Sequence, residues 1–355
     1  MPVVKNSFIT IGDTKIGPQH PPFIIAELSG NHNQQLELAL EMVDAAAKAG
    51  AHAIKLQTFT ADSMTLDVKS AEFVIQEEDS LWHGASLHDL YAKAATPYEW
   101  HSVLFDRAKA LGMLAFSSPF DAPAVDFLTE LNVPCFKIAS FELTDIPLIT
   151  KTASMGKPVI MSTGMASLSE IESAVAAAKA AGCDDIILLK CTSTYPAEAL
   201  NTNLHTIPHL RKAFNCTVGL SDHTAGVGVS IASVALGASV IEKHFVLDRQ
   251  AGGVDAAFSL EPSEFKLLVD ETERAWQALG EVKYGGSDVE QKSKQYRRSI
   301  YVCDDIKAGE LFTEQNLRVV RPALGLAPKH WDGVQGKHAT QNIEKGTALN
   351  WSHVR

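Results

Sequence analysis

Residues 22–245 repeat one pattern: a short apolar run, a polar turn, then an alanine-rich amphipathic stretch. The amphipathic stretches place apolar residues at i, i+3 and i+4, which predicts helices, for example at 36–49, 97–111, 122–131, 167–181 and 226–236. The eight apolar runs predict strands that are buried on both faces, at 23–26, 51–56, 113–116, 133–138, 159–161, 186–189, 217–220 and 238–241. Eight strands alternating with helices over roughly 220 residues favour an α/β fold of the (β/α)8 barrel type over a doubly wound sheet.

The segments outside this pattern suggest the domain boundaries. Residues 62–95 are too long for an ordinary connection after the second strand, so we interpret them as a lid or specificity insertion. A closing helix at 265–279 precedes a polar, glycine-bearing segment that is typical of a linker. Short β-like runs follow, and Ile306–Gly309 and Ile343–Gly346 share the same spacing. We expect a barrel domain over 1–281, a linker over 282–296 and a small β-rich domain over 297–355, which docks against another surface because its own core is small.

Composition excludes several classes of protein. The chain has 31 basic and 42 acidic residues, a net charge of −11, and no basic run, which argues against nucleic-acid binding. No apolar stretch approaches the ~20 residues that span a bilayer, and the first residues do not resemble a secretory signal. The five cysteines are scattered without C-x-x-C spacing, which argues against disulfides and structural zinc. We expect a cytoplasmic protein that binds neither nucleic acid nor membrane.

Every predicted strand ends in polar residues, although its interior is apolar. In a (β/α)8 barrel, residues at the C-terminal ends of the strands form the active site, so this arrangement indicates an enzyme. In chain order these residues are Glu27; Lys55 and Gln57; Ser117 and Ser118; Lys137 and Ser140; Ser162, Thr163 and Gly164; Lys190, Cys191, Thr192 and Tyr195; Ser221, Asp222 and His223; and Glu242, Lys243 and His244.

Two histidines at the last two strand ends indicate a metal site. Successive side chains of a strand alternate between its faces, so Glu242 and His244 share a face. His223 lies at a matching height on the neighbouring strand. Two imidazoles with an open coordination sphere can hold a divalent transition metal such as Mn²⁺ or Zn²⁺. The alternative is that one or both are buried, hydrogen-bonded histidines.

Two lysines indicate an anion-binding site. Lys55 and Lys137 end apolar strands, where a buried ammonium group is costly without an anionic partner. Hydroxyl and backbone donors that could hold a phosphate or carboxylate with them come from Ser118, Ser140, Ser162, Thr163 and Gly164. The alternatives are pairing with a carboxylate of the barrel, or Schiff-base chemistry. The SGNHN segment at 29–33 could cap the first helix or contact a ligand.

At these strand ends the chain resembles the sialic acid synthase family, in order along the sequence. The segments that carry the resemblance are IIAELSGNHNQ, AGAHAIKLQT, AFSSPFD, CFKIAS, VIMSTGM, LLKCTSTYP, VGLSDHT and VIEKHF. The tail RRSIYVCDDIKAGELFTEQNLRVVRPALGL is similar to the antifreeze-like (SAF) domain of that family. AELSGNHNQ, SFELTDIPLI and SLWHGASLHDLY are similar to its pseudaminic acid synthase branch. The resemblance implies a TIM barrel followed by a C-terminal β-rich SAF domain.

The resemblance also implies a reaction and its cofactor. Members of the family are transferases that condense phosphoenolpyruvate with an open-chain acetamido-hexose, giving a nine-carbon 2-keto acid and phosphate. His223 and His244 would bind a divalent metal, Mn²⁺ in most members, with Mg²⁺ or Co²⁺ as alternatives. Glu27 and Glu242 would be the catalytic carboxylates, with Glu27 the first choice for proton transfer and for positioning water.

The remaining roles that the resemblance implies concern the two substrates. Phosphoenolpyruvate would be bound by Lys55, Ser118, Lys137, Ser140, Ser162, Thr163, Gly164 and Ser221. The sugar would be bound by Gln57, Tyr195, Asp255 and Arg321. Arg321 would reach the active site of the other subunit of a domain-swapped homodimer, where the C-terminal domain acts as a cover. Ser118 replaces a threonine of many members and keeps the hydroxyl, whereas GGVDAAF replaces a GPD-type loop around Asp255.

Three alternative functions stay open. The same chemistry could use N-acetylmannosamine or the precursor of legionaminic acid, with the 62–95 insertion and the Asp255 loop deciding the sugar. A metal-dependent aldolase acting on a pyruvate-type substrate would also use two histidines on a barrel, but it would release no phosphate. The antifreeze-like tail alone would suggest an ice- or carbohydrate-binding protein, whose binding a chelator should not affect.

Overall fold

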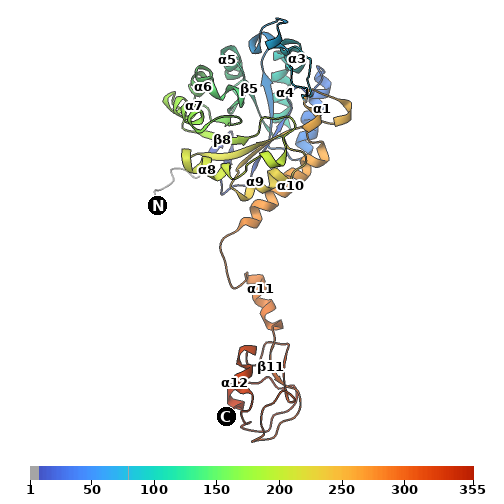
Figure 1. The fold of residues 1–355 in the computed structure, drawn as a ribbon, viewed down its shortest axis with the longest axis vertical. Coiled ribbons are helices and arrows are strands. Elements are labelled where there is room, and N and C mark those ends of the chain that lie inside the picture. The colour runs from blue at the N-terminus through green and yellow to red at the C-terminus, as the bar shows by residue number, and fades with distance from the viewer. Residues whose placement is uncertain (1–7, 79) are drawn as a thin grey trace. The chain divides into compact units, whose positions relative to one another are not determined.

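The computed structural model describes residues 8–78 and 80–355, which divide into two compact units between Gly280 and Glu281. The first unit is a closed barrel of parallel strands in the order β10-β3-β4-β5-β6-β7-β8-β9, surrounded by helices (Figure 1). The barrel strands are β3 Phe23–Glu27, β4 Ala53–Thr58, β5 Leu114–Pro119, β6 Phe136–Ile138, β7 Val159–Ser162, β8 Ile186–Cys191, β9 Thr217–Asp222 and β10 Val240–His244. The predicted (β/α)8 barrel is therefore confirmed, and each predicted strand overlaps one observed strand.

The helices that cover the barrel follow the apolar periodicity of the sequence. In α1 the buried residues are Ala39, Met42, Val43 and Ala46, which form one stripe along the helix. Gly50 follows this helix with φ 90°, a backbone conformation that glycine adopts without strain, so the helix ends there. The covering helices are α1 Leu36–Lys48, α4 Tyr98–Ala110, α5 Ala122–Glu130, α6 Ile146–Ala153, α7 Leu168–Ala180, α8 Thr206–Phe214, α9 Gly228–Ala235 and α10 Pro262–Leu279.

An N-terminal hairpin adds to the barrel and was not predicted, because its strands are too short to show a pattern. Strands β1 (Ile9–Ile11) and β2 (Thr14–Ile16) pair antiparallel. Ile11 and Ile16 are buried in the same apolar cluster as Phe23, the first residue of β3. The hairpin therefore packs at the N-terminal ends of the strands, opposite the end that carries the polar residues.

The long segment between β4 and α4 forms an excursion with its own short elements, as its length predicted. It contains α2 (Ala61–Met64), a 3-10 turn and α3 (Leu87–Ala94).

The 3-10 helices among the described residues are η1 Ala71–Phe73, η2 Phe141–Thr144, η3 Ala199–Asn201, η4 Arg249–Ala251, η5 Ala256–Phe258, η6 Lys294–Tyr296, η7 Pro328–His330 and η8 Trp351–His353. Over residues 8–78 and 80–355, no helix is both long and apolar enough to cross a membrane.

The second unit is built around a small core of its own. Strands β11 (Ser299–Val302) and β12 (Leu317–Val320) pair antiparallel, and α12 spans Trp331–Val334. The two segments with shared spacing pair with each other, because Ile306 and Ile343 exchange backbone hydrogen bonds of 2.8 Å in both directions. The segment interpreted as a linker contains a helix, α11 (Asp288–Ser293), which the polar composition concealed.

Candidate active site

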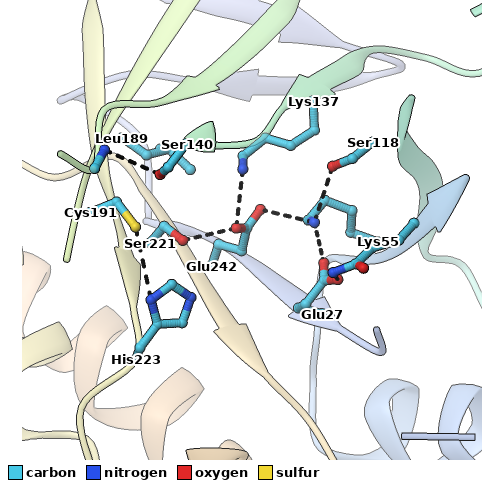
Figure 2. Close-up of polar contacts among 12 residues, drawn as sticks. Glu27, Lys55, Ser118, Lys137, Ser140, Leu189, Cys191, Ser221, His223 and Glu242 are labelled. Atoms are coloured by element: carbon cyan, nitrogen blue, oxygen red, sulfur yellow. Dashed lines mark hydrogen bonds and ion pairs between the residues drawn. The ribbon is translucent and has the colours of Figure 1, made fainter. Parts of the chain in front are cut away.

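The charged strand-end residues converge inside the C-terminal end of the barrel (Figure 2). The register pairs Glu27 with Lys55 on one side and with His244 on the other, and it pairs Glu242 with Ser221. Because neighbouring strands are in this register, their side chains reach the barrel interior at similar heights. The Glu27, Lys55 and Glu242 side chains are at most 6% exposed, so these charges interact with one another rather than with water.

Glu242 lies at the centre of this charge network (Figure 2). Its Oε1 is 3.3 Å from Lys137 Nζ and accepts a hydrogen bond of 3.0 Å from Ser221 Oγ. Its Oε2 is 3.9 Å from Lys55 Nζ, and Lys55 also contacts the Glu27 carboxylate. Both lysines therefore pair with carboxylates of the barrel, as one of the alternatives expected, and anion binding by the same lysines stays a prediction.

Hydroxyl and amide groups complete the network. Lys55 Nζ donates to Ser118 Oγ at 3.3 Å, and Gln57 Nε2 donates to Glu27 Oε1 at 3.0 Å. Ser118 and Gln57 are cross-strand partners on β5 and β4, so both reach the same side of the cluster. Glu27 is thus held from two sides by Lys55 and Gln57.

Burial and charge move the pKa values of the two carboxylates in opposite directions. Burial raises the pKa of Glu27 to about 7, although the Lys55 ammonium opposes this shift. Burial also acts on Glu242, but Lys137 and Lys55 outweigh it and lower the pKa of Glu242. Burial lowers the pKa of Lys137, with Glu242 opposing. One carboxyl group can therefore exchange a proton near neutral pH while its neighbour stays ionised, a combination suited to acid–base chemistry.

A second group of donors lies beside Lys137, at the ends of β6 and β7. The backbone N–H of Gly164 donates to Ser140 Oγ at 3.1 Å, and a Cβ atom at residue 164 would lie 2.1 Å from Ser193 Oγ, so only glycine fits. The Ser162 hydroxyl is buried and has no hydrogen-bond partner among the residues that the structure describes. A buried orphan hydroxyl at a strand end is suited to binding a ligand oxygen.

Strand alternation directs several other strand-end residues away from the cluster. The Thr163 hydroxyl donates to the Leu189 carbonyl of the neighbouring strand β8 at 3.1 Å, so it does not join the donors around Lys137. Ser117 Oγ lies 2.6 Å from Thr58 Oγ1, and Lys190 Nζ contacts Thr192 Oγ1 at 3.1 Å. Asp222 and Lys243 form an ion pair with each other.

His223 and His244 lie side by side, with ring centroids 5.2 Å apart. His223 Nδ1 lies 2.9 Å from the Thr192 carbonyl oxygen and donates to it when it carries the ring proton, which leaves Nε2 for a ligand. His244 Nδ1 is buried without a hydrogen-bond partner in the described part of the chain, and it lies 3.7 Å from Asp255 Oδ2. No group of three or more metal-ligating side chains occurs among residues 8–78 and 80–355. The pair nevertheless fits a metal, because a buried imidazole nitrogen needs a partner and the second imidazole is held by a carbonyl.

The loop that contains Asp255 is held by Asn31, in the 29–33 segment for which the sequence analysis gave two possible roles. Asn31 Nδ2 donates to the Phe245 carbonyl at 3.0 Å and to Ser259 Oγ at 2.9 Å, while Asn31 Oδ1 accepts from the Asp255 backbone N–H at 3.0 Å. Helix α1 has Gln35 at its N-cap with no side-chain capping bond, so the capping interpretation of residues 29–33 is wrong. Burial raises the pKa of Asp255 beside His244.

Two of the predicted sugar-binding residues lie in different units. The Tyr195 ring is 4.6 Å from the His223 ring, measured between centroids, so it borders the histidine pair. Arg321 belongs to the second unit, where it is exposed directly after β12. Its expected role at a barrel of another subunit stays a prediction.

Glu142 was not identified from the sequence as a site residue, and Cys191 was named at its strand end without a role. Glu142 Oε2 is buried without a hydrogen-bond partner among the described residues, and burial raises the pKa of Glu142 to about 7, with Lys137 opposing. Cys191 Sγ lies 3.9 Å from His223 Nδ1. Glu142 lies in η2, just beyond the end of β6, and is therefore not among the polar residues at the strand ends. An acidic residue two positions after the serine of the CFKIAS segment is the signal that could have found it.

Comparison with known proteins decides the family. The NeuB family model matches residues 42–284, which is more than half of the chain. The chain belongs to the NeuB family. A SAF domain model matches residues 297–355, which makes this a NeuB family protein with a C-terminal SAF domain.

Individual relatives of this NeuB family protein cover nearly its whole length. It is 45% identical over 333 residues to a pseudaminic acid synthase of Campylobacter jejuni, an alignment that spans 94% of this chain and 96% of the relative. It is 42% identical over 331 residues to a pseudaminic acid synthase of Helicobacter pylori, covering 93% and 97%. Among solved structures, N-acetylneuraminic acid synthetase from Leptospira borgpetersenii matches with a TM-score of 0.72 and 37% identity, covering 81% of this chain and 94% of that one.

Proposed function

We propose that this protein is a pseudaminic acid synthase, which condenses phosphoenolpyruvate with 2,4-diacetamido-2,4,6-trideoxy-β-L-altropyranose and water to give pseudaminic acid and phosphate. The observation that carries the proposal is the buried cluster of Lys55, Lys137, Glu27 and Glu242 among serine hydroxyls at the C-terminal end of a NeuB barrel. The two pseudaminic acid synthases at 45% and 42% identity favour this sugar.

Phosphoenolpyruvate supplies the anionic groups that the lysine cluster can bind. Its carboxylate and phosphate would be shared between the ammonium groups of Lys55 and Lys137 and hydroxyl donors around them. The hydroxyl donors are Ser118, Ser140, Ser162 and Ser221, with the backbone of Gly164 beside them. The lowered pKa of Lys137 supports this assignment, because the Glu242 carboxylate at 3.3 Å does not offset burial and an added anion would. The orphan Ser162 hydroxyl would gain its missing partner in the same way.

A divalent metal, Mn²⁺ or alternatively Mg²⁺ or Co²⁺, would be held by His223 and His244. Support comes from the partnerless His244 Nδ1 and from the carbonyl that holds His223 Nδ1. When bound, the metal would act as a Lewis acid toward the aldehyde oxygen of the open-chain sugar. Asp255, Tyr195 and Gln57 would then face the sugar, because they border the histidines and Glu27.

The residues of the cluster account for the proton transfers of the reaction. C3 of phosphoenolpyruvate forms a bond with the aldehyde carbon, and the aldehyde oxygen takes up a proton to become a hydroxyl. Water adds at C2 and loses one proton; cleavage of the C–O bond at C2, with loss of the proton of the new C2 hydroxyl, leaves the 2-keto group and releases phosphate. Glu27, with its pKa near 7, would position this water and accept its proton. Glu242, kept ionised by Lys137 and Lys55, would stabilise positive charge that develops at C2.

The proposal extends to assembly. We propose a domain-swapped homodimer in which Arg321 of the partner subunit completes the sugar site. Support comes from the exposure of Arg321 in a SAF unit whose own core is small, since both features suit a domain that functions by docking.

The test is phosphate release from phosphoenolpyruvate with Mn²⁺ and three sugars in parallel: 2,4-diacetamido-2,4,6-trideoxy-L-altrose, N-acetylmannosamine and 2,4-diacetamido-2,4,6-trideoxymannose. Release with the altrose alone, abolished by a chelator, is the expected result. Release with another sugar would keep the chemistry and assign the enzyme to the sialic or legionaminic acid branch. The absence of release with all three sugars would reject the proposed reaction and leave the aldolase alternative.

A further inference from the structure

Trp82 lies in the excursion between β4 and α4, close to residues 84 and 85, which pair with Ile75. The loop is fastened at its base by a backbone hydrogen bond of 3.0 Å from Ile75 to Ala85 and by one of 2.9 Å from Gly84 to Ile75. The Trp82 carbonyl accepts a further bond of 3.0 Å from Ala85, and the Trp82 backbone N–H donates to Ser80 Oγ at 3.2 Å. These turn bonds fix the backbone from which the indole side chain projects.

The Trp82 side chain contacts a residue that follows a strand on the opposite side of the barrel. The loop follows β4, whereas Tyr195, whose ring centroid is 6.0 Å from that of Trp82, follows β8. In the closed barrel, β4 and β8 are separated by three strands in either direction, so they lie on opposite sides. Trp82 Nε1 also donates to the Val254 carbonyl at 3.1 Å, in the loop that follows β10. The indole is therefore anchored to segments that reach the mouth from two other strands.

Beneath Trp82, aromatic rings lead down to the two histidines. Tyr195 packs against His223 with a centroid distance of 4.6 Å, and Phe258 packs against His244 at 4.9 Å. Tyr195 and Phe258 are themselves 5.3 Å apart. The only polar atom of the indole, Nε1, already donates to the Val254 carbonyl. The part of the indole that a molecule lying over these rings could contact is therefore apolar.

We propose that Trp82 is a specificity-determining residue for the acceptor sugar, forming an apolar wall that favours a methyl group over a hydroxymethyl group at C6. This inference rests on the proposed function. The aldehyde end of the open-chain sugar must lie beside the lysine cluster and the histidines, so C6 points outward to the level of Trp82. A hydroxyl group placed against the indole loses its hydrogen bonds to water and gains none in return. Apolar pockets reject an added hydroxyl only weakly, so we expect a preference of about 10- to 100-fold.

The test compares kcat/KM for 2,4-diacetamido-2,4,6-trideoxy-L-altrose with that for its 6-hydroxy counterpart in the full-length enzyme. In Trp82→Ala we expect the preference for the 6-deoxy sugar to fall to within about threefold of unity, mainly through a lower KM of the 6-hydroxy sugar, because the apolar wall that disfavours the hydroxyl is lost. The KM of phosphoenolpyruvate should stay unchanged. Trp82→Phe keeps an apolar ring and should retain the preference. Leu81→Ala, a truncation of the neighbouring half-exposed side chain, is the matched control.

Two results would overturn the inference. One is a Trp82→Ala enzyme that keeps the full preference for the 6-deoxy sugar while the wild type shows it. If Trp82→Ala does not fold, Trp82→Gln replaces it, because the glutamine places a polar amide where the indole lies. An unchanged preference for the 6-deoxy sugar in Trp82→Gln would also overturn the inference. The other is a wild-type enzyme that accepts only N-acetylmannosamine, which carries a hydroxymethyl group, because this overturns the choice of sugar as well. In the first case the proposed function survives, so the two failures are distinguishable.

Discussion

Asp222 and Lys243 are register partners on β9 and β10 and form a fully buried ion pair, with Lys243 Nζ 2.9 Å from Asp222 Oδ2. Asp222 also accepts hydrogen bonds from the backbone and hydroxyl of Thr224 and from Ser230 Oγ. Asp222 lies between Ser221 and His223, and Lys243 lies between Glu242 and His244. Because successive side chains alternate between faces, the ion pair points away from the barrel interior and these four neighbours point into it. The pair therefore lies on the outer side of the two strands, and the site residues that flank it lie on the side of the barrel interior.

We predict that Asp222→Leu and Lys243→Met each lower the free energy of unfolding by about 3–5 kcal/mol, because each leaves a buried charge without its partner. The double variant Asp222→Leu/Lys243→Met should recover a large part of this loss, since no uncompensated charge remains. Urea unfolding of all four proteins measures both effects. Strictly additive losses in the double variant would contradict the assigned coupling.

Replacing Glu27 tests the proton-transfer role. We expect Glu27→Gln to lower kcat by about 10²- to 10⁴-fold while the KM of phosphoenolpyruvate changes little. Because Glu27 would act as a base with a pKa of about 7, wild-type kcat should rise as the pH increases through 7. The residual activity of Glu27→Gln should lack that rise. A variant that keeps the same pH profile would assign the titrating group elsewhere.

The metal assignment can be measured without turnover. We expect His223→Ala and His244→Ala each to weaken Mn²⁺ binding at least about 100-fold by calorimetry, because each removes one of two imidazole ligands. His209→Ala, an exposed histidine on α8, serves as the control and should bind Mn²⁺ like the wild type. Undiminished Mn²⁺ affinity in both site variants would show that the metal is held elsewhere.

Glu142 should make stability depend on pH. Its pKa is about 7 in the folded protein against an ordinary value of 4.5, so the unfolded chain loses this proton at lower pH. Stability is therefore lost as the pH rises from about 4.5 to about 7, by up to about 3 kcal/mol. Glu142→Gln cannot ionise, so we expect it to be more stable than the wild type at pH 8 and similar at pH 5. Urea unfolding at both pH values checks this, and an equal offset at both would refute it.

Mixing two inactive variants tests the swapped dimer. Arg321→Ala would damage the SAF unit that serves the partner, whereas Glu27→Ala would inactivate its own barrel. After subunit exchange, mixed dimers would contain one intact site, so activity should recover to about a quarter of the wild-type value. If Arg321→Ala is inactive and the mixture stays inactive although mass spectrometry detects mixed dimers, the swapped arrangement is wrong.

Much of the barrel could be predicted because its strands are covered on both faces. Such strands must be apolar throughout, which makes runs like 159–161 and 186–189 visible in the sequence. The β1–β2 hairpin and α11 escaped prediction for the opposite reason, since short or exposed elements bury too little to impose a pattern.

The residue types at the ends of the strands are visible in the sequence. Parallel strands carry their C-terminal ends to one side of a barrel, so Lys55, Lys137, Glu242 and the two histidines could be expected to meet there. How they pair depends on the closed barrel, in which Glu242 lies between the two lysines and Glu27 is held by Lys55 and Gln57.

The same division holds for the residues that surround the site. The contact of Trp82 with Tyr195, the anchoring of the Asp255 loop by Asn31, and the burial of Glu142 join segments that are distant in the chain or lie beyond the strand ends. Periodicity is a local property, because it reflects which face of one element is buried. Contacts across the barrel mouth arise only when the barrel closes, so no local pattern can encode them.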